Sequence, residues 1–203
     1  MAGSESVWDP AAGYFNMLGS SRSQVVNALR AADGGSQKLL GVGGQHLDRA
    51  RLANAALVGA PTLPAWQRYS GVVWSNLDPS SLGAVARRRI VVVSGLLGLV
   101  RGDDPIPDYR LKMSASLHPL GKLSAWWRQE ISVALNRIAQ RRFLIDLLPQ
   151  EHRAAWVPGP RLRGSSIGFV DRSGSPGGHF AKAAKGRLAR EVLLRGAAAV
   201  NEW

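Results

Sequence analysis

One stretch decides the fold: Ile90-Val-Val-Val-Ser-Gly-Leu-Leu-Gly-Leu-Val-Arg101, continuing as Gly102-Asp-Asp-Pro-Ile-Pro-Asp-Tyr-Arg-Leu-Lys-Met113. Its β-branched start, bounded by Gly95, predicts a buried strand over residues 90–94. Residues 103–108 hold two prolines and three carboxylates, so we expect a rigid, non-helical loop there. Loops that follow the end of a strand commonly present binding groups. This one carries Arg101, Asp104, Asp108, Tyr109, Arg110 and Lys112, although its carboxylates and guanidinium groups could equally pair with each other to fix the loop.

The remaining elements are arranged around this stretch. Apolar periodicity predicts helices over residues 21–32, 45–58, 124–140 and 180–195, the third capped by Ser124. Shorter apolar runs predict strands over residues 143–148 and 166–170. No linker or repeat divides the chain. We therefore expect an α+β fold in a single domain over residues 21–203, with a small central sheet flanked by helices, after a poorly defined N-terminal segment over residues 1–20.

The composition favours an anionic partner. Lys and Arg number 26 against 14 Asp and Glu, a net charge of +12 that suits nucleic acid, phosphates or an acidic protein. A codon bias towards arginine, as in the GC-rich genomes of actinobacteria, explains the same excess without a partner. Cysteine is absent, which excludes disulfides and thiolate catalysis.

The chain shows no sign of a membrane or metal protein. Neither a signal peptide nor a membrane span is apparent, so we expect a cytoplasmic protein. The four histidines lack the spacing of metal ligands, and no cofactor motif occurs, so we expect neither a metal nor a cofactor.

Several motifs occur in order over roughly residues 54–195. The pattern S-G-L-x-G-x-V-R begins at Ser94 and is followed by D-x-I-x-x-Y-R-L-x-M, which ends at Met113. Further motifs are found at Tyr69–Asp78, Leu123–Trp127, Ile145–His152 and His179–Arg190. Together they resemble the YaaA family (DUF328, UPF0246) of bacterial peroxide-stress proteins, and several long motifs are more specific than one short pattern. Family members usually begin with a strand that leads into a Pro-Ser-x-x-Lys motif, which residues 1–20 lack, and continue beyond the basic helix. We therefore expect a shortened or divergent member.

The resemblance implies a distinctive α+β fold and a function in the peroxide-stress response, with DNA or another polyanion bound in a basic cleft. It also implies a helix-hairpin-helix-like element, for which Leu117–Leu123 is the nearest string. The anion contacts would come from the loop residues Arg101, Arg110 and Lys112 and from the basic helix residues His179, Lys182, Lys185, Arg187 and Arg190. We expect Arg101 or Arg110 to approach Lys185.

An enzyme is the alternative, so whether the chain catalyses a reaction stays open. On this hypothesis the scaffold serves specialised metabolism, for example aziridine ring closure with loss of sulfate, and a partner protein subunit could complete the site. Arginine and lysine would then hold the anionic leaving group, while Asp104 or Asp108 with Tyr109 would handle a proton.

Overall fold

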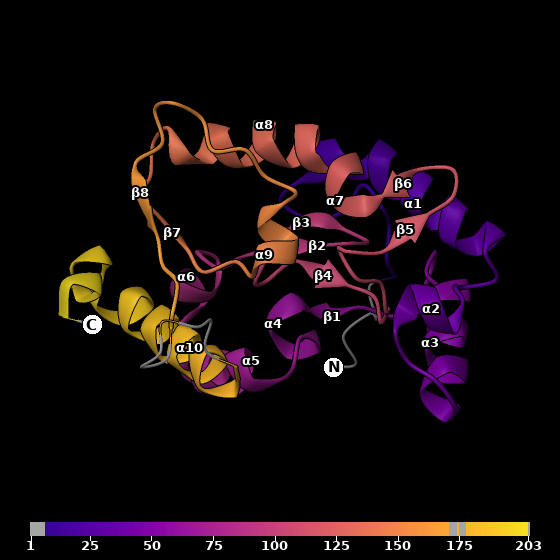
Figure 1. Cartoon of the computed structure of the whole chain (residues 1–203), viewed down its shortest axis with the longest axis horizontal. Helices are drawn as coiled ribbons and strands as arrows, with labels where there is room; N and C mark the ends of the chain where they lie inside the picture. The colour runs from indigo at the N-terminus through magenta and orange to yellow at the C-terminus, as the bar shows by residue number, and fades with distance from the viewer. Residues whose placement is uncertain (1–6, 171–173, 175–177, 203) are drawn as a thin grey trace, which may run out of the picture.

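The computed structural model describes residues 7–170, 174 and 178–202, and a β-hairpin lies at its centre (Figure 1). Strand β2 (Val91–Ser94) pairs antiparallel with β3 (Gly98–Arg101), which places Val92 opposite Val100. The strand predicted from the β-branched run is confirmed. The sequence motif after Ser94 forms the hairpin turn and a second buried strand, so the expected loop begins only after Arg101.

The other strands also pair two by two in the described part of the chain. Strand β1 (Leu63–Pro64) pairs with β4 (Pro105–Ile106), and β5 (Ser116–Leu117) pairs with β6 (Gly121–Lys122). Strand β7 (Leu144–Asp146) lies parallel to β8 (Gly164–Ser166). The expected mixed α+β fold is confirmed, with its strands in small sheets and helices around them.

Helices surround the hairpin on several sides (Figure 1). The α-helices are α1 (Gly19–Ala31), α2 (Gln37–Leu40), α3 (Gln45–Ala55), α4 (Ala65–Arg68), α5 (Val72–Leu77), α6 (Ala84–Arg87), α7 (Leu123–Trp126), α8 (Arg128–Ala139), α9 (Gln150–Arg153) and α10 (His179–Arg195). Short 3-10 turns are η1 (Asn16–Leu18), η2 (Pro79–Ser81) and η3 (Ala197–Glu202). The four predicted helices therefore correspond to α1, α3, α7 with α8, and α10. Within residues 7–170, 174 and 178–202, no helix combines the length and apolarity needed to cross a bilayer.

Three local predictions are wrong. Ser124 does not cap a helix, because α7 begins one residue earlier and Lys122 occupies the N-cap position. Strand β8 begins at Gly164 and ends at Ser166, where the prediction placed the start of the strand. Residues 116–122 form the β5–β6 hairpin, which contains a cis His118–Pro119 bond. The string that was expected to be helix-hairpin-helix-like is therefore a β-hairpin.

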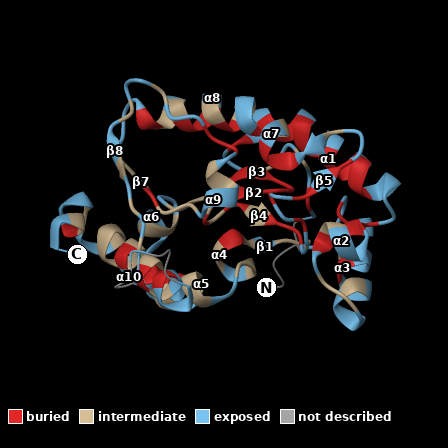
Figure 2. Ribbon diagram, in the orientation of Figure 1, coloured by how far each residue is buried: buried red, intermediate tan, exposed pale blue. Residues whose placement is uncertain are grey.

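A single large hydrophobic cluster forms the core, and the hairpin and the inner faces of α1, α7 and α8 supply much of it (Figure 2). Trp127 is fully buried there, and its indole N–H donates to the Gly95 carbonyl at 2.8 Å. The expected poorly defined segment takes part in this core from Val7 onward, because Trp8, Phe15 and Leu18 are all buried in it. Residues 1–6 lie outside the described part of the chain.

Helix α10 packs outside that core. It lies beside α5, and both views show the two helices side by side at the lower edge of the molecule (Figures 1 and 2). Its buried residues are mostly small: Ala181, Ala184, Gly186 and Leu188. A Cβ on Gly186 would lie 2.7 Å from the Cβ of Asn76 and would also meet the Val73 carbonyl oxygen. The glycine is therefore required by the close approach of the two helix backbones.

Candidate functional site

Three hydroxyl groups meet beside the central hairpin. The phenol of Tyr109 lies 2.6 Å from the Ser94 hydroxyl and 2.7 Å from the phenol of Tyr69. Ser94 Oγ also accepts the Leu97 backbone N–H at 3.1 Å, so it is fixed by the hairpin turn. Sequence reasoning named Tyr109 but missed Ser94 and Tyr69 as its partners, although both belong to the quoted motifs.

The two phenols hold their protons strongly. Burial raises the pKa of Tyr69 well above its usual range, and the hydrogen-bonded Tyr109 beside it acts in the same direction. Burial also raises the pKa of Tyr109, although its hydrogen bonds with Ser94 and Tyr69 partly oppose that rise. Both side chains are therefore neutral near pH 7. The cluster forms a chain of hydrogen bonds through three hydroxyls, but it does not supply a phenolate.

Asp104 fixes the backbone around it. One carboxylate oxygen accepts the Tyr14 N–H at 2.9 Å and the other accepts the Arg101 N–H at 2.8 Å. The residue is buried, and Gly13 packs against the carboxylate. Asp104 therefore joins the N-terminal segment to the end of β3. Asp108, the other predicted carboxylate, is exposed.

Arg22 is a buried cation that the sequence analysis did not single out. Its guanidinium group donates to the carbonyls of Leu97 and Leu99 in the hairpin, at 2.9 and 2.7 Å, and to those of Pro10 and Ala12, at 2.9 and 2.8 Å. Burial lowers its pKa to about 10, and nearby Asp104 opposes that change. Its position on the otherwise apolar face of α1, three residues before Val25, was the available signal.

The predicted loop cations lie in different surroundings. Arg101 places its guanidinium carbon 3.1 Å from the centre of the Tyr14 ring, a cation–π contact. Arg110 is exposed and its Nε donates to the Leu40 carbonyl of α2 at 3.4 Å. Lys112 is also exposed and its amine lies against Gly41. Arg110 and Lys112 thus belong to the α2 side of the molecule.

Lys185 reaches from α10 towards the end of β7. Its amine donates to the Leu147 carbonyl at 2.9 Å. Burial lowers its pKa, the positive charge of Arg153 adds to this effect, and Asp146 opposes it. Arg153 and Asp146 themselves form an ion pair at 3.0 Å. Lys185 is therefore part of a small charged junction that joins α10 to β7 and α9.

We expected Arg101 or Arg110 to approach Lys185, and for Arg110 this prediction is wrong. Arg110 contacts α2, and α2 and α10 lie at opposite ends of the longest axis of the molecule (Figure 1). Arg101 contacts the Tyr14 ring, whereas Lys185 contacts the β7 loop. The loop and the basic helix thus supply cations to separate surfaces.

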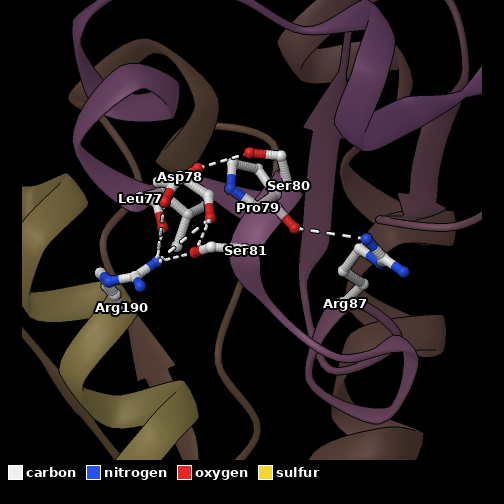
Figure 3. A network of polar contacts seen from close by, with 7 residues as sticks. All are labelled: Leu77, Asp78, Pro79, Ser80, Ser81, Arg87 and Arg190. Atoms are coloured by element: carbon white, nitrogen blue, oxygen red, sulfur yellow. Dashed lines mark hydrogen bonds and ion pairs between the residues drawn. The ribbon is translucent and has the colours of Figure 1, made fainter.

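Arg190 is engaged in a structural network (Figure 3). Its guanidinium group donates to Ser81 Oγ at 2.7 Å and to the carbonyls of Asp78 and Leu77 at 3.1 and 3.2 Å. The Ser80 hydroxyl donates to the Asp78 carboxylate at 2.6 Å, and this bond is the main cause of the lowered pKa of Asp78. These contacts tie α10 to the turn after α5. His179, Lys182 and Arg187, by contrast, are exposed on α10.

A second group of cations surrounds the end of α8. Arg141 and Arg142 follow that helix, and Arg161 and Arg163 precede β8; we call these four residues the arginine cluster. The Leu144 N–H donates to the Arg163 carbonyl at 2.9 Å, which brings the two arginine pairs together across the β7–β8 ribbon. All four are exposed, and none of their side chains makes a hydrogen bond or ion pair with another described residue. Sequence analysis missed the cluster because its pairs are about 20 residues apart and only the parallel strand pairing joins them.

Comparisons with known proteins cover most of the chain. A family model described as Peroxide stress protein YaaA matches residues 14–202. A UPF0246 protein of Streptomyces coelicolor is 37% identical over 152 residues, which are 71% of this chain and 58% of that protein. A UPF0246 protein of Corynebacterium glutamicum is 33% identical over 187 residues, which are 89% of this chain and 75% of that protein. The chain thus spans only part of the length of these relatives. The family match covers the hydroxyl cluster, the arginine cluster and α10 alike, and the chain belongs to the YaaA peroxide-stress family.

Proposed function

We propose that this protein is a cytoplasmic member of its family that binds DNA or another polyanion through exposed cations. The observation that carries the proposal is the arginine cluster, whose four guanidinium groups have no acidic partner among the described residues. A guanidinium group without a partner on the protein can bind phosphate oxygens in a two-point geometry. The net charge of +12 would increase the rate at which a polyanion reaches this surface.

Helix α10 supports the same proposal less strongly than its sequence suggests. Lys182 and Arg187 are exposed and available for phosphates. Lys185 and Arg190 already donate to protein carbonyls, so their substitution would also loosen the helix. No contact among the described residues favours the enzyme alternative, since Asp104 is bonded to backbone N–H groups and Tyr109 to hydroxyls.

A salt series with a fluorescent duplex tests the proposal. We expect affinity to fall steeply as salt rises, because each phosphate contact that releases a counterion contributes about 0.9 to the slope of log K against log salt. Lys182→Ala with Arg187→Ala should lower both the affinity and the slope. Changing all four residues of the arginine cluster to Gln should lower them further.

The matched control removes charge elsewhere. Lys38 and Arg49 are exposed on α2 and α3, at the other end of the molecule, and their double Ala variant should bind almost as wild type does. Absence of binding by the wild-type protein, or binding that is insensitive to salt, would contradict the proposed function. Equal losses in the control and α10 variants would show that only net charge matters.

A further inference from the structure

An aromatic ring lies within the arginine cluster. Phe143 follows Arg142 directly and is 51% exposed, although residues of its type are usually buried. It precedes β7, whose Leu144 and Asp146 line a small cavity together with Trp156. Because side chains alternate along an extended chain, Phe143 points to the opposite side, away from that cavity.

The strand pairing brings arginine to this outer side. Leu144 of β7 pairs with Gly164 of β8. Phe143 and Arg163, which directly precede these two residues, therefore lie side by side at the start of the ribbon. Arg142 precedes Phe143 in the chain. Figure 1 shows this ribbon at one edge of the molecule, next to the end of α8.

The helix dipole does not explain the cluster. Cations in the last turn of a helix interact favourably with its carbonyl end, which accounts for Arg137 in α8. Arg161 and Arg163, however, belong to the loop before β8, and their side chains make no polar contact with the described residues. Neither a helix end nor an acidic partner among the described residues thus accounts for the positions of Arg161 and Arg163.

We propose that Phe143 and the arginine cluster form a binding site for single-stranded nucleic acid. The guanidinium groups bind the phosphodiester backbone, and the phenyl ring stacks on an unpaired base. Basic grooves with an accessible aromatic ring are how proteins hold single strands without reading their sequence. A duplex hides its base faces and can use only the cations. This inference rests on the proposed function, since it names the preferred polyanion and the residues that select it.

The test compares four probes of similar length: oligo-dT, oligo-U, a duplex, and inorganic polyphosphate, which carries charge but no base. The wild-type protein should bind both single strands more tightly than the duplex and polyphosphate. Phe143→Ala and Phe143→Leu should weaken single-strand binding roughly tenfold, leave polyphosphate affinity unchanged and leave the salt slope unchanged. Similar affinities for oligo-dT and oligo-U would fit stacking on a base whichever sugar carries it. A large difference between them would show that the sugar is recognised and would overturn the proposal that base stacking selects the strand.

Phe180→Ala is the matched control, because Phe180 is 71% exposed on α10, away from the cluster. It should bind all four probes as wild type does. If the wild-type protein binds polyphosphate and duplex as tightly as single strands, or if Phe143→Ala and Phe180→Ala behave alike, the inference fails while the proposed function stands. If none of the probes binds, both fail.

Discussion

At the residue scale, buried polar groups hold the centre of the protein together. Arg22 shows this best, since one guanidinium group satisfies carbonyls from the N-terminal segment and from the hairpin. Replacement of Arg22 by a residue without donors would leave several buried carbonyls unsatisfied, at a cost of about 1–3 kcal/mol for each such group. A lysine could not replace it, because an ammonium group lacks the planar fork that reaches four carbonyls.

The hydroxyl cluster leads to a prediction at high pH. The raised pKa values of Tyr69 and Tyr109 mean that the unfolded chain loses these protons first, near the usual phenol pKa of about 10. The contribution of these two tyrosines to the unfolding free energy is thus fully present below about pH 10. It is lost as the pH rises further, by up to ~1.4 kcal/mol per pH unit and per tyrosine. Tyr69→Phe should make the unfolding free energy less dependent on pH between about pH 10 and about pH 11. Urea unfolding at a series of pH values measures this dependence.

The comparison of slopes separates this effect from others. Tyr69→Phe also loses a hydrogen bond, but that loss shifts the whole curve instead of changing its slope. Groups that titrate at high pH away from Tyr69 are common to both proteins and cancel, whereas Tyr109 and Arg22, which Tyr69 influences, contribute to the difference. Parallel curves for the variant and wild type would show that Tyr69 has an ordinary pKa.

At the element scale, the docking of α10 on α5 depends on a missing side chain. Alanine at position 186 would favour the isolated helix by about 1 kcal/mol. Its methyl group would nevertheless overlap Val73 and Asn76, and overpacking of this kind costs typically 1–3 kcal/mol. The overlapped atoms include backbone atoms of α5, which cannot move aside easily, so the cost should lie in the upper part of this range. After subtraction of the helix propensity, we expect Gly186→Ala to destabilise the protein by about 1–2 kcal/mol.

Chemical denaturation checks that expectation. Lys182→Ala, on the exposed side of the same helix, provides the control and should change stability little. A Gly186→Ala protein more stable than wild type would mean that helix propensity outweighs the contact with α5.

Much of the fold could be predicted from local patterns. The β-branched run at residues 90–94 and the periodic stretches of α1, α8 and α10 are strong signals, and the structure confirms them. The pairing of the strands could not be predicted, because no local pattern indicates that Gly98–Arg101 folds back on β2 or that β8 lies beside β7. The candidate site shows the same limit, because Phe143 and Arg163 meet only through that pairing. The role of Gly186 could not be predicted either, because the helix that it contacts lies over 100 residues earlier in the chain.

At the scale of the whole molecule, the excess of positive charge is spread over opposite ends. A net charge of +12 destabilises a compact protein through self-repulsion. We therefore expect polyphosphate to raise the Tm more than sodium chloride does at equal ionic strength, since a ligand that binds only the folded state stabilises it. Replacement of the arginine cluster by Gln should remove most of that difference. Scanning calorimetry measures it, and equal effects of both salts would indicate screening alone.

The position of α10 outside the main hydrophobic cluster has a further consequence for how the protein opens. Its interface with α5 consists largely of small side chains, so it buries little apolar surface, and the polar contacts of Lys185 and Arg190 fix its position. A unit attached in this way can detach and return while the rest of the chain keeps its native packing. We therefore expect two levels of cooperativity. The central body unfolds as a whole, whereas the docked fraction of α10 depends on whether an anionic ligand competes with the protein carbonyls for Lys185 and Arg190.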